Sequence, residues 1–85
     1  MSEQAVQSAV ERAVGQAFDR WANEHPSLAA VIDRIMVTDR AVESLRESDE
    51  YRQAVTAYHN GMSENDMLNK LLDLAGPVIS RLLTG

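Results

Sequence analysis

The chain has 85 residues, which suffices for one small domain with a modest hydrophobic core. Its composition is 45% hydrophobic, which predicts a folded rather than a disordered chain, and the absence of cysteine excludes disulfides and thiolate metal sites. The formal net charge of −5 disfavours nucleic acid as a partner, because affinity for phosphates comes mostly from clustered Lys and Arg.

The first predicted element is a helix over residues 3–23, because apolar residues recur there every four positions. Two adjacent rows have this spacing: Ala5, Ala9, Ala13, Ala17 and Trp21, and beside them Val6, Val10, Val14 and Phe18. The small side chains of the alanine row would let another helix approach closely. The residues that follow the helix lead into Pro26, which disfavours helical angles in the residue before it.

A second helix is expected over residues 26–37, since the fixed φ of proline suits the first turn of a helix. Its apolar face would consist of Leu28, Ala29, Val31, Ile32, Ile35 and Met36. Continuing the same phase would bring Asp39 into this face, so we expect a break near Val37-Thr38. Thr38 is then the predicted N-cap of the next helix.

Residues 39–59 allow two interpretations, one continuous helix or two helices over residues 39–47 and 49–59. The apolar positions of the two halves are out of phase, and Ser48 followed by two acidic residues is typical of a helix N-terminus. We therefore favour a break at Ser48. The second of these helices is expected to end at Asn60-Gly61, with the glycine in the left-handed conformation.

The last predicted helix covers residues 64–83. Ser63 is its expected N-cap, with Asp66 completing a capping box and Met62 packing against Met67. The apolar residues cover about half of the helical wheel, and their phase survives Gly76-Pro77. We therefore expect one helix, kinked at Gly76-Pro77, rather than two.

Together these elements predict an all-α fold, an irregular bundle of four or five helices. The helices are expected over about residues 3–23, 26–37, 39–47, 49–59 and 64–83, within a single domain spanning residues 1–85. The first and last helices are expected to supply most of the core.

The sequence contains no arrangement typical of a catalytic or cofactor site. The two histidines, His25 and His59, lie far apart and are each expected to be structural. Glu43-Ser44-Leu45 resembles the Asp-Ser-Leu at which acyl carrier proteins attach their prosthetic group, but the preceding Gly is missing and the flanking residues are predicted to be helical. We therefore expect no catalytic residues, no cofactor and no metal.

The leading functional hypothesis is a non-enzymatic protein–protein interaction or assembly module, not an enzyme, that forms homodimers through its amphipathic helices. The expected interaction surface consists of Ala5, Ala9, Ala13, Val78 and Leu82. The alternative is a small acidic regulator or inhibitor that binds a basic protein or, with less support, nucleic acid. A cytoplasmic location without membrane contact is expected, because the polar N-terminus lacks a signal-peptide pattern and no apolar run could span a bilayer.

Overall fold

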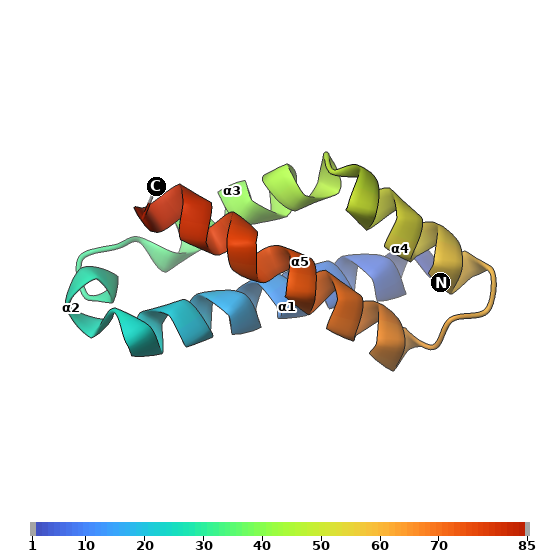
Figure 1. The fold of residues 1–85 in the computed structure, drawn as a ribbon, viewed down its shortest axis with the longest axis horizontal. Helices are drawn as coiled ribbons and strands as arrows, with labels where there is room; N and C mark the ends of the chain where they lie inside the picture. The colour runs from blue at the N-terminus through green and yellow to red at the C-terminus, as the bar shows by residue number, and fades with distance from the viewer. Residues whose placement is uncertain (1, 85) are drawn as a thin grey trace.

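Five helices follow one another along residues 2–84, which are the residues that the computed structural model describes (Figure 1). They are α1 (Ser2–Glu24), α2 (Pro26–Ala29), α3 (Arg34–Arg46), α4 (Asp49–His59) and α5 (Glu64–Thr84). This part of the chain contains no strand, so the predicted all-α bundle is confirmed. Met1 and Gly85, which the predicted domain 1–85 includes, lie outside the described residues.

The two long helices, α1 and α5, form the central pair of the bundle. Both run from the right to the left of Figure 1, while α3 and α4 return along the opposite direction and cover them. The largest fully buried side chains come from three of these helices: Val10 and Val14 of α1, Leu45 of α3, and Met67, Leu71 and Ile79 of α5. Burying each such side chain stabilises the fold by about 1.5–3 kcal/mol relative to leaving it in water. The expectation that the first and last helices dominate the core therefore agrees with the structure.

The second helix is much shorter than predicted. α2 ends at Ala29, residues 30–32 form a turn and a bend, and α3 begins at Arg34. The N-cap of α3 is Asp33, whose Oδ1 accepts hydrogen bonds from the backbone N–H groups of Ile35 and Met36 at 3.1 and 3.3 Å. The predicted helix 26–37 is therefore wrong, because a side-chain cap at Asp33 starts a new helix inside it.

Thr38 consequently lies inside α3 rather than at its start. Its hydroxyl donates to the backbone carbonyl of Arg34 at 2.8 Å, which is the local bond that a threonine within a helix commonly makes. The prediction of Thr38 as an N-cap, with a helix over residues 39–47, is corrected to α3 with its cap at Asp33.

The predicted break at Ser48 is confirmed. The Oγ of Ser48 accepts a hydrogen bond from the Tyr51 N–H at 3.1 Å and caps α4. At the other end of α4, the N–H of Met62 donates to the Ala57 carbonyl and the N–H of Gly61 donates to the Tyr58 carbonyl. These two bonds make a Schellman motif, and it requires the positive φ of 118° that Gly61 adopts.

The expected start of the last helix is also confirmed. The Oγ of Ser63 accepts from the Asp66 N–H at 3.1 Å, directly before α5 begins at Glu64. The helix continues through Gly76-Pro77 to Thr84, and Pro77 is exposed to solvent. An exposed proline removes one backbone hydrogen bond without disturbing the buried face of the helix. The kink at Gly76-Pro77 stays a prediction.

Candidate interaction surface

The residues that the sequence predicted for the interaction surface are mostly covered by the chain itself. Ala9, Ala13 and Val78 are buried, Ala5 is half-buried, and Leu82 is exposed. The reason is that the alanine row of α1 packs against the chain's own α5. A helical wheel shows which face needs a partner but not whether that partner belongs to the same chain. Of the predicted surface, only Leu82 and part of Ala5 are accessible in the single chain.

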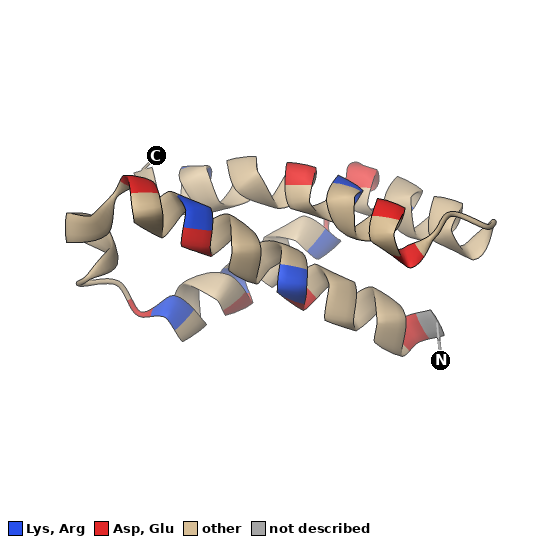
Figure 2. Cartoon of the chain, turned by 90° about the horizontal axis from the view of Figure 1, so that it is seen from below, with Lys and Arg blue, Asp and Glu red and all other residues tan. Residues whose placement is uncertain are grey.

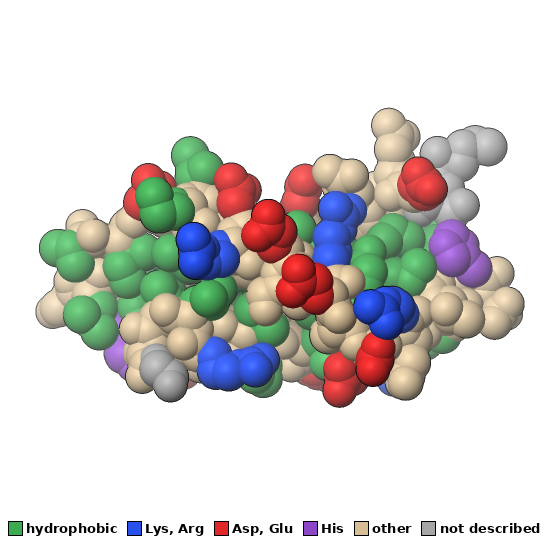
Figure 3. Space-filling model, turned by 90° about the horizontal axis from the view of Figure 1, so that it is seen from above, with side chains coloured by type: hydrophobic (Ala, Val, Ile, Leu, Met, Phe, Trp, Pro, Cys, Tyr) green, Lys and Arg blue, Asp and Glu red, His purple; other side chains and the backbone are tan. Residues whose placement is uncertain are grey.

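A different set of large apolar side chains faces solvent in the described part of the chain. This set, which we call the apolar end, consists of Leu28, Val31, Ile35, Met36 and Leu82. Val31, Ile35 and Met36 have 82%, 72% and 64% of their surface exposed. In Figure 3 hydrophobic side chains gather at the left end, where Figure 1 places α2, the first turns of α3 and the last turns of α5. The surface is thus built from three segments that are distant in sequence.

The exposure of the apolar end follows from the helical phase of α3. Ala41 and Leu45 lie one turn apart and face the core. At 100° per residue, Ile35 and Met36 point roughly 120° and 140° away from Ala41, in opposite directions around the axis. Nor can α2 cover them, since it has only four residues and none of them is buried. The apolar residues predicted to share one helical face over residues 26–37 thus lie on two helices and the turn between them, and four of the six face solvent: Leu28, Val31, Ile35 and Met36.

A charged contact fixes the start of α3 on α1. The guanidinium of Arg34 pairs with the carboxylate of Asp19 and lies over the ring of Phe18, 5.1 Å from its centroid. Gly15 lies beside this side chain, and a Cβ at that position would be in ordinary van der Waals contact with the Arg34 Nη2 atom, at 3.4 Å. The residues next to Arg34, which belong to the apolar end, are thereby held in a defined position.

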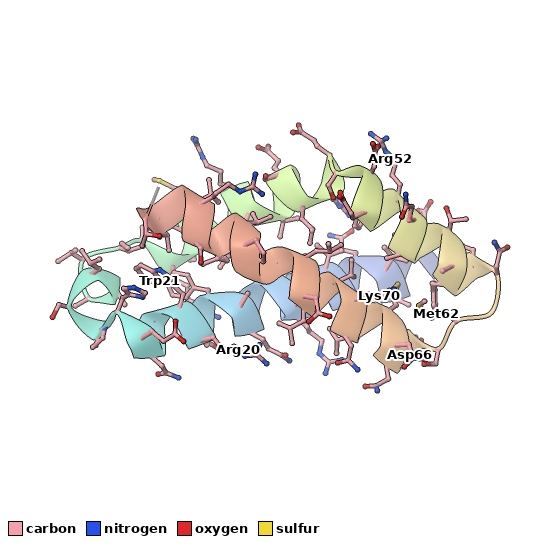
Figure 4. All side chains as sticks on the ribbon, viewed as in Figure 1. Arg20, Trp21, Arg52, Met62, Asp66 and Lys70 are labelled. Atoms are coloured by element: carbon pink, nitrogen blue, oxygen red, sulfur yellow. The ribbon has the colours of Figure 1, made fainter. Side chains whose placement is uncertain are left out.

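The corner between α1 and α2 is fixed by an aromatic stack. Trp21 is buried (Figure 4), and the ring of His25 stacks on it with 4.7 Å between centroids and 17° between planes. The backbone N–H of His25 also donates to the Trp21 carbonyl at 2.9 Å. The apolar end therefore sits on an ordered support, and His25 has the structural role that the sequence predicted.

Charge is distributed unevenly along the molecule. Residues 15–40 and 74–84, which build the half with the apolar end, contain four acidic and four basic residues: Asp19, Glu24, Asp33 and Asp39, with Arg20, Arg34, Arg40 and Arg81. The remaining nine acidic and four basic residues give the other half the whole net charge of −5 (Figure 2). The half that exposes large apolar side chains is thus electrically neutral.

Open hollows lie between α5 and its neighbouring helices. One, of about 270 Å³, lies between α4 and α5, where Glu50, Lys70 and Asp73 line it. A smaller one, of about 170 Å³, is lined by Trp21 of α1 and by Ser80 of α5. Lys70 and Asp73 bring opposite charges to an open surface in the first, and the second is smaller than a typical ligand pocket. Neither hollow has the enclosed apolar lining of a typical ligand pocket.

The remaining sequence candidates do not converge on one site. His25 lies at the α1–α2 corner, whereas His59 lies in the last turn of α4, at the other end of the molecule (Figure 1). Ser44 lies inside α3 and not at the start of a helix, where an acyl carrier protein places its modified serine. Across residues 2–84, no three His, Cys, Asp or Glu residues are grouped so that they could hold a metal ion. None of the helices in this range combines the length and hydropathy needed to cross a membrane.

Comparisons with protein-family models, with curated proteins and with solved structures found no match for this chain.

Proposed function

We propose that the chain is a non-enzymatic protein–protein interaction module that acts through the apolar end. The observation that supports this proposal is the gathering of Leu28, Val31, Ile35, Met36 and Leu82 at one end of an otherwise well-packed bundle. Their exposed apolar areas sum to on the order of 500 Å², within the range of about 300–600 Å² for the largest apolar patch on a typical monomer. The largest such patch on a monomer is often functional.

The apolar side chains alone offer too little energy for specific binding. Removing about 500 Å² of apolar surface from water favours association by on the order of 10 kcal/mol. The loss of translational and rotational freedom costs an amount of the same order. The apolar side chains therefore have to form the centre of a larger contact, with the charged residues around them as its rim.

A photo-crosslinking experiment in the native host tests the proposal. A photoreactive amino acid replaces Val31, which is the most exposed residue of the apolar end. The control carries the same amino acid at Thr56, which is exposed on α4 in the other half of the molecule. We expect irradiation to join a protein to position 31 and not to position 56. Equal yields at both positions, or no crosslink at position 31, would contradict the proposal.

A second candidate function is that of an acidic regulator that binds a basic protein. The observation in its favour is that the half that contains α4 has nine acidic residues and only four basic ones. Binding through that half would weaken steeply as salt rises, because it would depend on charge. Binding through the apolar end would change little between low and moderate salt. Crosslinking from position 56 rather than position 31 would favour this second candidate.

A further inference from the structure

We infer that the partner of the apolar end is a second copy of this chain, bound in a two-fold symmetric dimer. This inference rests on the proposed function, because it names the molecule that covers the same surface. It moves the homodimer contact expected from the sequence away from the buried residues Ala9, Ala13 and Val78 and places it on the segment from Leu28 to Met36.

The area of the surface agrees with a dimer contact. A stable interface of ordinary size buries about 800 Å² on each partner, with an apolar centre and a polar rim. The apolar end supplies on the order of 500 Å² for such a centre, and the exposed charged residues beside it supply the rim. A dimer would also cover Val31, Ile35 and Met36, the three most exposed large apolar side chains in residues 2–84.

The distribution of charge also favours a second copy. Two identical chains repel each other when they meet through surfaces of the same net charge. The half with the apolar end has four acidic and four basic residues, so its net charge gives no such repulsion. The molecule is 42 Å long, which leaves the two acidic halves separated by more than the Debye length of about 8 Å at physiological salt. Contact through the apolar end is therefore the arrangement that best tolerates a charge of −5 on each chain.

The rim of the surface is suited to two-fold symmetry. Asp39 and Arg40 are exposed on α3, one turn after Ile35 and Met36. A two-fold axis brings the same surface of both copies together, so each copy contributes one acid and one base beside the apolar centre. In an antiparallel packing of two α3 helices centred on Ile35 and Met36, the Asp39-Arg40 pairs of the two copies lie at opposite edges of the apolar contact.

Sedimentation equilibrium at about 100 μM, a concentration at which an association with a Kd in the micromolar range is largely complete, tests the inference. The wild-type protein should have about twice the 9.4 kDa mass of one chain. Val31→Glu and Met36→Lys should each raise the dissociation constant at least tenfold, because both place a charge in an apolar contact. Thr56→Glu adds the same charge as Val31→Glu in the other half and should leave the dimer intact.

The two substitutions introduce opposite charges, which separates an effect of the net charge from an effect on the apolar contact. Val31→Glu makes the chain more negative, whereas Met36→Lys makes it less negative. If only the net charge controlled association, Met36→Lys would strengthen the dimer, and this result would overturn the inference. Helix content measured by circular dichroism should match the wild type in both variants, since positions 31 and 36 are exposed in the single chain.

Two further results would overturn the inference. One is a wild-type protein that is monomeric at about 100 μM, and the other is a dimer that both variants preserve. The first result together with a crosslink from position 31 to a different protein would refute the second copy but retain the proposed function. No crosslink from position 31 to any protein would refute both.

Discussion

The guanidinium of Arg34 lies 5.1 Å from the centroid of the Phe18 ring and ties the first turn of α3 to α1. The same guanidinium pairs with Asp19, the residue that follows Phe18. Because Ile35 and Met36 follow Arg34 directly, this contact reinforces the position that the packing of Ala41 and Leu45 in the core gives to the start of α3. The exposed side chains are thus positioned by contacts of other residues in the same helix and not by their own burial.

Arg34→Gln is expected to lower the free energy of unfolding by about 1 kcal/mol, because it removes both the cation–π contact and the ion pair. Asp19→Asn removes only the ion pair between two half-exposed side chains and should cost less, about 0–0.5 kcal/mol. Urea denaturation of both variants at one fixed protein concentration measures the difference. Equal losses for the two substitutions would mean that the Phe18 contact contributes nothing.

The parts of the fold that the sequence predicted well have local signals. Ser48 and Ser63 are cap residues directly before their helices, and Gly61 is the glycine of a helix C-terminus. These residues act on backbone groups within a few positions, so their effect can be read without knowing the rest of the fold. The apolar spacing of α1 and α5 repeats over many consecutive residues, which was sufficient to predict both helices.

The start of α3 was missed because two local signals conflict there. The apolar spacing continues from Leu28 to Met36, which favours one helix, while Asp33 inside this stretch can cap a new one. The cap prevails in the structure, since α2 has no buried residue that would anchor a longer helix. An apolar face that no other element covers gains no free energy from burial, so its periodicity alone does not stabilise a helix.

The candidate surface could not be predicted from the sequence. Ala9 and Leu28 both lie in apolar patterns, but one is buried in the chain and the other is exposed. Which pattern is covered depends on how α1, α3 and α5 pack, and this is a property of the whole fold. The neutral charge of the half with the apolar end likewise appears only when residues 74–84 are placed beside residues 15–40.

Leu71→Ala is expected to destabilise the fold by about 2–5 kcal/mol, because Leu71 is completely buried and its truncation leaves a cavity. The neighbouring Leu72 is only partly buried, so Leu72→Ala should cost markedly less. Chemical denaturation of both variants gives the comparison. A loss below about 0.5 kcal/mol for Leu71→Ala would contradict the role of α5 as a core helix.

Ser63→Ala should cost about 1 kcal/mol, because the Asp66 N–H loses its side-chain acceptor. The matched control is Ser44→Ala, at an exposed position inside α3, where alanine is the better helix former. Ser44→Ala should leave stability unchanged or raise it slightly. If both substitutions have the same effect on the urea midpoint, the cap at Ser63 does not stabilise α5.

Two glycine substitutions should differ in their effect on stability. Gly76 lies inside α5, and apart from its chain neighbours a Cβ there would meet no atom within 4 Å. Pro77 disfavours a helical residue with a Cβ before it, which offsets the better helix propensity of alanine, so Gly76→Ala should change stability by less than about 0.5 kcal/mol. Gly61 has a φ of 118° in the Schellman motif after α4, a conformation that a Cβ makes unfavourable. Gly61→Ala should therefore destabilise by about 1–2 kcal/mol, although the space around it is also open. Thermal unfolding at one protein concentration distinguishes the two, and a stabilising effect of Gly61→Ala would show that the left-handed turn before Ser63 is not required.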